Sequence, residues 1–194
     1  IQDNLLKATV TLPEQGGQGV LVSGNLIITA AHCIDFTCEG GMSLGDYYIE
    51  KLNTAYGELR VKPLAVEPVA DVAVLGSLDN QEFHKEADDF EKFCEETKPM
   101  SVCQTDFGLS HSFPVYIYTH KGKWVTATAH QSTVDAETLA VEADEQIEPG
   151  TSGGPIVNAA GELVGIVSLF SIRTHENDKS MGFTPRPHQS VADT

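Results

Sequence analysis

Three short motifs contain the side chains with which this chain could do covalent chemistry. His32 closes the motif at residues 29–33 (TAAHC), Asp71 opens residues 71–75 (DVAVL), and Ser152 lies in residues 150–155 (GTSGGP). A serine hydroxyl becomes a useful nucleophile when a base takes its proton, and an imidazole with an ordinary pKa of about 6.5 suits that task. A buried carboxylate would orient the imidazole and stabilise its cation. The three residue types predict nucleophilic catalysis by an activated serine.

The glycines around Ser152 predict a binding site for negative charge. Glycine lets the backbone turn sharply, so that neighbouring N–H groups can point at one spot. The backbone N–H groups of Gly150 and Ser152 are the expected donors to the oxyanion of a tetrahedral intermediate.

Each motif is weak evidence by itself. A lone histidine at a strand end is usually structural, a lone aspartate before an apolar strand is usually a turn or cap residue, and a Gly-Thr-Ser-Gly-Gly segment is often only a tight turn. Here all three occur once, in the order His, Asp, Ser, with the serine alone in the second half of the chain. The catalytic hypothesis therefore rests on the combination.

The elements that must hold these residues are mostly short β-strands between Gly, Asn and Asp turns. Strands are expected at residues 5–12, 19–22, 26–30, 47–49, 58–63, 70–75, 115–119, 123–130, 138–143, 155–157, 163–170 and 181–184. Between them, apolar residues spaced by three or four within 78–97 predict an acidic amphipathic helix. The pattern predicts an all-β fold of two packed barrels with a short helical connector. The expected division is an N-terminal lobe at 1–77, the connector at 78–99 and a C-terminal lobe at 100–194.

The three motifs together resemble the chymotrypsin-like (trypsin-like) serine peptidase family, over roughly residues 10–184. Residues 146–158 are most similar to bacterial trypsin-like and HtrA-type protease domains, and the PDZ domain that usually binds peptides in the HtrA type is not expected within these residues. The resemblance implies two six-stranded antiparallel barrels and serine endopeptidase activity. It also implies that His32 is the general base, Asp71 its orienting partner and Ser152 the nucleophile.

The resemblance further implies which residues bind substrate. They are Gln146, Ile147, Glu148, Val167, Ser168, Leu169, Phe170 and Gly182. Ser168 is expected to support the Asp71 carboxylate, and the backbone from Ser168 to Phe170 is expected to pair with substrate as an added strand. No acid stands where trypsin-type enzymes carry one, so the expected residue before the scissile bond (P1) is apolar and small or medium in size.

One position departs from the family pattern. Thr151 stands where activated pancreatic-type enzymes carry an aspartate that pairs with a newly freed N-terminal ammonium. Because threonine carries no charge, activity is not expected to depend on burying the ammonium of Ile1.

Three alternatives use the same serine. A pseudo-protease would keep the triad but serve as a binding module, and an esterase would use the same machinery on another acyl group. Residues 150–154 also fit the nucleophile elbow of α/β-hydrolases, which requires an acid and then a histidine after the serine. Asp178 and His188 follow Ser152, but no convincing helix does.

Charge and composition narrow the partners. The 194 residues carry 28 acidic and 12 basic side chains, a formal net charge of −16, which disfavours nucleic acid and anionic membranes and leaves a protein or peptide substrate as the expected partner. We interpret this negative charge first as a contribution to solubility or an adaptation to a salty habitat, and only second as a means of steering cationic substrates. No apolar run is long enough to span a membrane, and no signal peptide is recognised. The family resemblance favours a secreted or periplasmic location without deciding against the cytoplasm.

The cysteines and remaining histidines predict neither a cofactor nor a metal site. Cys33, Cys38, Cys94 and Cys103 lack metal-ligand spacing, and no histidine has such spacing with a second histidine or cysteine. The even cysteine count permits two disulfides, including a local Cys33–Cys38 link, but free thiols are the favoured interpretation.

Overall fold

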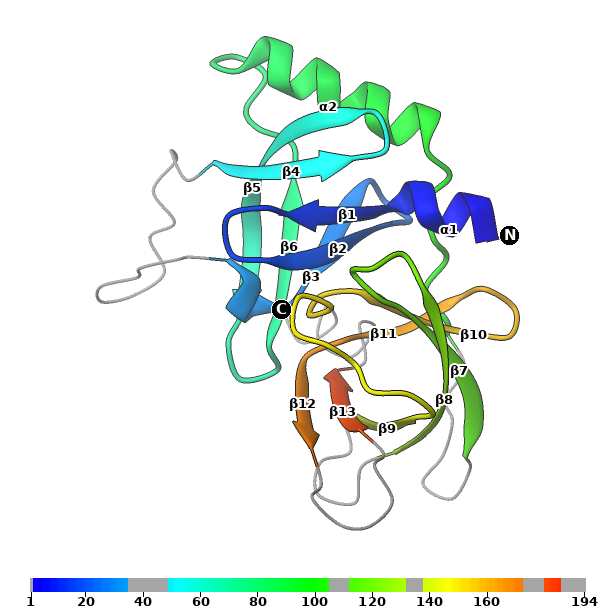
Figure 1. Cartoon of the computed structure of the whole chain (residues 1–194). Helices are drawn as coiled ribbons and strands as arrows, with labels where there is room; N and C mark the ends of the chain where they lie inside the picture. Colours follow the sequence, from blue (N-terminus) through cyan, green and yellow to red (C-terminus); the bar gives the residue numbers. More distant parts are fainter. Residues whose placement is uncertain (1, 35–48, 105–111, 132–137, 173–179, 186–194) are drawn as a thin grey trace.

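The chain forms two β-lobes in a computed structural model that describes residues 2–34, 49–104, 112–131, 138–172 and 180–185. The N-terminal lobe is a closed barrel with strand order β1-β2-β3-β6-β5-β4, and the C-terminal lobe is a curled seven-stranded sheet (Figure 1). This is the chymotrypsin-like fold, as predicted. Among the described residues, two segments form α-helices.

The barrel strands form where apolar and β-branched residues alternate or run together. Their bounds are β1 (Thr9–Leu12), β2 (Gly17–Val22), β3 (Leu26–Thr29), β4 (Glu50–Thr54), β5 (Gly57–Glu67) and β6 (Val72–Gly76). The predicted hairpin at β2 and β3 is confirmed, with Val22 opposite Leu26. Its turn requires left-handed backbone at Gly24 (φ 97°) and Asn25 (φ 59°), the residue types that tolerate it. A 3-10 turn, η1 (Ala31–Cys33), follows β3 and carries His32.

The strand predicted at residues 5–12 is wrong in its first half. Residues 2–8 form helix α1 (Gln2–Ala8), and β1 begins only at Thr9. Leu5 and Ala8, three residues apart, are both buried, so the segment covers the barrel with one helical face. Of the strand predicted at 47–49, residues 47 and 48 lie outside the described residues.

The C-terminal sheet has the order β11-β10-β7-β8-β9-β13-β12. Its strands are β7 (Phe113–Tyr118), β8 (Trp124–Gln131), β9 (Thr138–Ala143), β10 (Pro155–Asn158), β11 (Leu163–Ile166), β12 (Leu169–Ile172) and β13 (Ser180–Pro185). The single strand predicted at 163–170 is divided into β11 and β12. The break has a physical cause: the Val167 backbone bonds to Gly153 and Gly154 instead of continuing one ladder.

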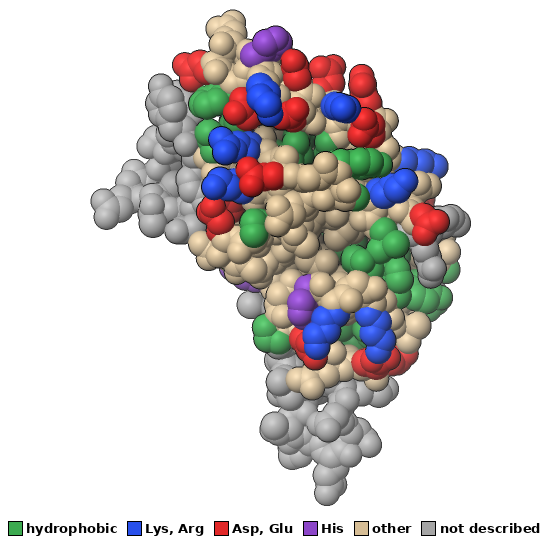
Figure 2. Space-filling model, turned by 45° about the horizontal axis from the view of Figure 1, so that its top comes forward, with side chains coloured by type: hydrophobic (Ala, Val, Ile, Leu, Met, Phe, Trp, Pro, Cys, Tyr) green, Lys and Arg blue, Asp and Glu red, His purple; other side chains and the backbone are tan. Residues whose placement is uncertain are grey.

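The predicted acidic helix is confirmed as α2 (His84–Glu96). One face is buried, through Ala87, Phe90, Phe93 and Cys94, and the helix packs on β5. Its outer face carries ion pairs spaced by four residues, such as Lys85–Asp89 at 2.8 Å. Figure 2 shows these mixed acidic and basic side chains gathered at the top of the molecule.

The segment after α2 joins the two lobes through backbone hydrogen bonds. Met100 exchanges bonds with the end of β2, since its N–H donates to the Leu21 carbonyl at 2.9 Å and its carbonyl accepts from Ser23 at 3.0 Å. Two residues later, Val102 forms a parallel bridge with Leu163 of β11. The barrel core continues across this junction, because Val157, Leu163 and Ile166 of the C-terminal lobe belong to the same apolar cluster.

The thiols of Cys33, Cys94 and Cys103 are free and buried, and Cys38 lies outside the described residues. In the part of the chain that is described, no helix is both long and apolar enough to cross a bilayer.

Candidate active site

His32 lies at the end of the barrel, where β3 turns into η1. Its Nδ1 is 2.7 Å from Oδ2 of Asp71, and its backbone N–H donates to Oδ1 of the same carboxylate at 2.9 Å. The carboxylate therefore fixes both the backbone and the ring of His32. With Nδ1 occupied, Nε2 is the ring nitrogen left for a substrate or a nucleophile.

Asp71 has unusual backbone geometry. It lies just before β6 with φ at +55°, in the left-handed region that is uncommon for residues other than glycine. Its carbonyl accepts from Ala31 at 3.1 Å, so backbone and side chain both bind the His32 turn. A strained residue held by several bonds is typical of a functional site.

The two side chains shift each other's ionisation. The hydrogen bond to Asp71, with a smaller contribution from the Cys33 thiol, raises the pKa of His32 from 6.5 to about 10. Burial opposes ionisation of Asp71, but its hydrogen bonds from His32 and Ser168 prevail and hold the pKa of the carboxyl below its ordinary value. Asp71 is therefore ionised at neutral pH and stabilises the imidazolium that proton abstraction would form.

Ser168 connects this pair to the C-terminal lobe. Its hydroxyl donates to Oδ2 of Asp71 at 2.5 Å, and the residue is buried, with 6% exposed. Ser168 lies in the break between β11 and β12. That break thus brings a side chain of the second lobe to the carboxylate of the first.

The loop of Ser152 is attached to the barrel at β2. The Ser152 carbonyl accepts from the Gln18 N–H at 2.7 Å, and the Gly153 N–H donates to the Val167 carbonyl at 2.6 Å. Gly153 has φ at +77°, and a Cβ there would stand 1.9 Å from the Gln18 carbonyl oxygen. Only glycine allows this close approach of the two backbones.

The Ser152 loop of the C-terminal lobe and the His32 turn of the barrel both come close to Gly17 of β2. A Cβ on Gly17 would lie 3.2 Å from the Ser152 carbonyl oxygen and 2.5 Å from Sγ of Cys33, the neighbour of His32. Within the described residues, no hydrogen bond joins the Ser152 hydroxyl to the His32 ring. Such catalytic bonds are often long or poorly aligned without substrate.

The two expected oxyanion donors are uncommitted. Gly150 has φ at +97°, and among described residues neither its N–H nor that of Ser152 donates to another protein group. Between them, the Thr151 N–H bonds to the Glu148 carbonyl at 3.3 Å, and its carbonyl accepts from Gly154 at 2.9 Å. Within the described part of the chain, both amides thus lack a protein acceptor, as the expected oxyanion donors would.

The predicted pocket residues lie in different surroundings. Ile147 and Val167 are each 4% exposed and belong to the core of the C-terminal sheet, whereas Gln146 is exposed. Glu148 forms an ion pair with Lys121, which lowers the pKa of its carboxyl. The side chains of Leu169 and Phe170 lie outside what is described.

The backbone near the predicted pocket is defined by strand pairing. Phe170 of β12 pairs with Gly182 of β13, which in turn pairs with Val141 of β9. Strand β12 ends the sheet, so its other edge pairs with no described strand.

Two residues at the site were missed by sequence reasoning. His120 is on an exposed turn, and its Nδ1 lies 3.2 Å from Oγ1 of Thr151. Gln18 is 2% exposed and binds the Ser152 carbonyl through its backbone. Neither has a sequence signal, since both contacts join segments far apart in the chain.

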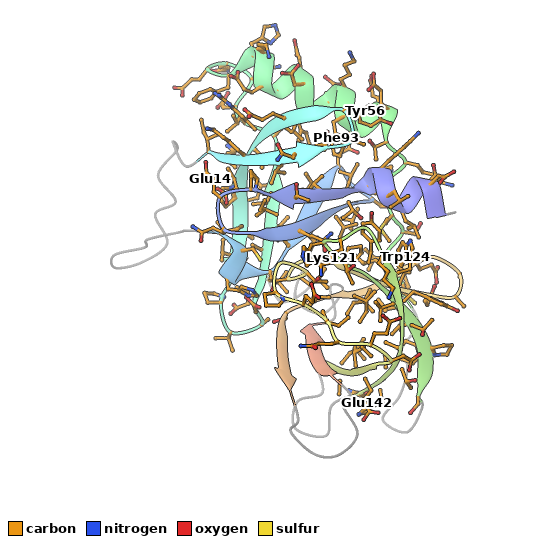
Figure 3. All side chains as sticks on the ribbon, viewed as in Figure 1. Glu14, Tyr56, Phe93, Lys121, Trp124 and Glu142 are labelled. Carbon is orange, nitrogen blue, oxygen red and sulfur yellow. The ribbon has the colours of Figure 1, made fainter. Side chains whose placement is uncertain are left out.

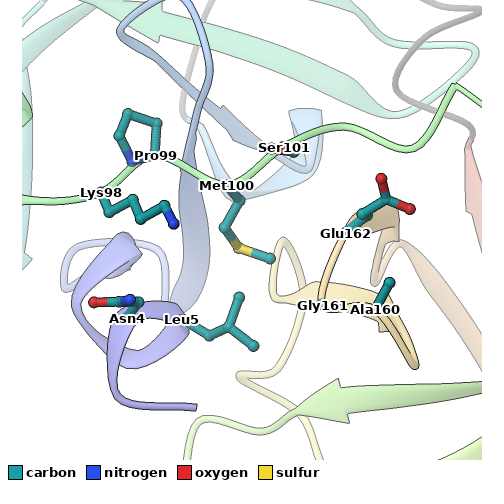
Figure 4. Close-up of a pocket in the computed structure, with 9 residues that line it drawn as sticks. All are labelled: Asn4, Leu5, Lys98, Pro99, Met100, Ser101, Ala160, Gly161 and Glu162. Carbon is teal, nitrogen blue, oxygen red and sulfur yellow. The ribbon is translucent and has the colours of Figure 1, made fainter. Parts of the chain in front are cut away.

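A pocket of about 160 Å³ lies away from these residues, where α1, the segment after α2 and the turn before β11 meet (Figure 4). Leu5 and Met100 form its apolar wall, and Lys98 and Glu162 are its charged residues. Among described residues, no three His, Cys, Asp or Glu side chains are grouped to hold a metal ion.

Comparison with known proteins agrees with this fold. Residues 17–166 match the model of the trypsin-like peptidase domain. A probable periplasmic serine endoprotease DegP-like from Pseudomonas savastanoi pv. phaseolicola is 28% identical over 159 residues, which are 81% of this chain and 30% of that protein. The chain thus spans less than a third of that relative.

Solved structures with the same fold include peptidases of two bacteria. The active form of the Rv3671c protease from M. tuberculosis superposes with a TM-score of 0.63 at 17% identity, covering 98% of this chain and 80% of that one. A serine endoprotease from Yersinia pestis gives 0.60 at 18% identity, covering 99% and 64%. Because the family model spans most of the sequence and the folds agree, the chain belongs to the trypsin-like peptidase family.

Proposed function

We propose that this chain is a serine endopeptidase in which Ser152 is the nucleophile, His32 the general base and Asp71 the residue that orients the base. The observation that carries the proposal is the network in which one carboxylate, Asp71, binds His32 through both ring and backbone and also accepts from Ser168. This network crosses the two lobes, and the Ser152 loop is attached beside it at Gln18.

The reaction follows from these positions. Ser152 Oγ attacks the carbonyl carbon while its proton passes to Nε2 of His32, and the oxyanion accepts from the N–H groups of Gly150 and Ser152. The carbon–nitrogen bond then breaks, and the amine leaves with the proton from His32. Water attacks the resulting ester with the same base, which frees the acid and restores Ser152.

Substrate binding is proposed at the free edge of β12. An extended peptide adds to such an edge through backbone hydrogen bonds. Glu148 is an acid in the expected pocket wall, but Lys121 already pairs with its carboxylate, which leaves it less able to bind a basic P1 side chain. A small or medium apolar P1 residue, such as Ala, Val, Leu or Ile, is therefore favoured over Lys or Arg.

The test is cleavage of a peptide library by wild type and by Ser152→Ala. Wild type is expected to cut after apolar residues, and the variant to lose about 10⁴- to 10⁶-fold in turnover with an unchanged circular dichroism spectrum. Cleavage that survives in the variant would refute Ser152 as the nucleophile. Hydrolysis of esters but of no peptide would favour the esterase alternative.

A further inference from the structure

The turn between β7 and β8 lies against the loop that precedes Ser152. The His120 N–H donates to Oγ1 of Thr151 at 3.4 Å, and the His120 ring contacts the same oxygen through Nδ1 at 3.2 Å. The next residue, Lys121, forms the ion pair with Glu148. Two consecutive residues of one turn thus hold both ends of the segment 148–151.

The turn is held together by backbone hydrogen bonds and an aromatic contact of its own. The Thr119 N–H donates to the Lys123 carbonyl at 2.9 Å, and Gly122 donates back to Thr119 at 2.9 Å. At its base the rings of Tyr118 and Trp124 are tilted against each other with centroids 5.0 Å apart. Figure 3 shows Lys121 and Trp124 at the end of the C-terminal lobe that faces the barrel.

Thr151 is the point of attachment. It is completely buried, and within the described part of the chain His120 is the sole partner of its hydroxyl. A buried hydroxyl is costly to leave unbonded, so the contact fixes the threonine rotamer and with it the backbone on either side. The flanking residues are Gly150 and Ser152, the two proposed oxyanion donors.

His120 also limits the movement of Gly150 directly. A Cβ built on Gly150 would lie 3.3 Å from Cγ of His120, so the imidazole stands in close contact with the glycine backbone. Gly150 has the conformational freedom to turn its N–H away from a substrate. The ring beside it blocks space that such a rotation would use.

We propose that His120 is a positioning residue that holds the oxyanion loop in its donating geometry through Thr151. The proposal rests on the proposed serine peptidase function. It gives the uncharged Thr151 a role: its hydroxyl is hydrogen-bonded to the β7–β8 turn, and this contact, supported by the Lys121–Glu148 ion pair, orders the loop.

The test compares His120→Ala and Thr151→Val with Thr151→Ser, which keeps the hydroxyl. Lys123→Gln is the matched control, because it removes an ion pair with Glu145 from the same turn without touching Thr151. His120→Ala and Thr151→Val are expected to lower kcat by about 10- to 100-fold, as a slightly misplaced catalytic group does, with little change in KM. The effects of the two substitutions should not add in full, because both remove the contact between the His120 ring and the Thr151 hydroxyl.

Hydrogen exchange of the peptides covering 147–154 supplies a readout that does not need activity. Exchange should be faster in His120→Ala and Thr151→Val than in wild type, Thr151→Ser and Lys123→Gln. If wild type is active and His120→Ala has the same kcat and the same exchange rates, the proposed role of His120 is overturned. If wild type cleaves no peptide but exchange is still faster in the two variants, the turn holds the loop as proposed and the peptidase function is refuted. Because His120 is exposed, its variant tests the proposal even where Thr151→Val does not fold.

Discussion

Asp71 is the residue on which the site depends most, because its single carboxylate binds His32 twice and Ser168 once. Its left-handed backbone, which favours glycine or asparagine, aims the carboxylate at the turn after β3. The motif at residues 71–75 could predict from the sequence that Asp71 orients His32. It had no means of predicting the left-handed backbone or the bond to the His32 N–H, because both depend on a turn 39 residues away.

The pH dependence of the reaction should reflect the raised pKa of His32. A base with a raised pKa stays protonated to higher pH, so the rate of Ser152 acylation should rise with pH through a midpoint above the ordinary 6.5. Asp71→Asn removes the carboxylate that causes the shift, so its midpoint should move down and kcat should fall by about 10⁴-fold. The measurement is the pH profile of kcat/KM for both proteins. A wild-type midpoint at or below 6.5 would contradict this account.

At the scale of elements, the break between β11 and β12 matters most. Residues 163–170 read as one continuous apolar strand in the sequence, and alternation alone offers no reason to divide it. The division arises because Val167 bonds to Gly153 and Gly154, a contact between two loops. By contrast, β9 lies at the predicted residues, since its boundaries are set by local pattern.

Helix α1 was predicted as part of a strand. Its apolar residues fit both the period of a strand and that of a helix, and the helix forms because Leu5 and Ala8 cover the barrel together. Tertiary contact, which the sequence alone does not reveal, decides between the two periods.

The approach of the Ser152 loop to β2 predicts unequal effects of two glycine substitutions. Both Gly24 and Gly153 have positive φ, but a Cβ on Gly24 meets nothing within 4 Å, whereas one on Gly153 meets the Gln18 backbone. Gly24→Ala should lower the free energy of unfolding by about 1–2 kcal/mol, the cost of left-handed alanine. Gly153→Ala should lower it by about 3 kcal/mol or more, because overpacking adds to that cost. Urea unfolding measures both, and equal losses would argue against the close approach.

At the scale of the molecule, the apolar core of the barrel extends into the C-terminal lobe, whose sheet also has an apolar core of its own. The barrel cluster includes three residues of the C-terminal lobe, and Met100 and Val102 connect β2 to β11 through the backbone. Sequence patterns could separate two β-rich halves and the helix between them. They could not predict how the halves dock, because docking depends on pairs of residues far apart in the chain.

The contact of the barrel core with residues of the C-terminal lobe predicts that the lobes unfold together. Trp124, the single tryptophan, lies in the C-terminal lobe, whereas α2 packs on the barrel. Tryptophan fluorescence and far-ultraviolet circular dichroism should therefore follow one coincident urea transition. Two separate midpoints would show that the lobes are independent.

The most direct measurement is labelling by a fluorophosphonate, followed by mass analysis of the labelled peptide. The account predicts one adduct per chain, on Ser152, formed in the folded protein and abolished in His32→Ala as well as in Ser152→Ala. That result requires an imidazole of one lobe to activate a hydroxyl of the other. A folded wild-type protein that stays unlabelled, or labelling of Ser152 at an unchanged rate without His32, would contradict it.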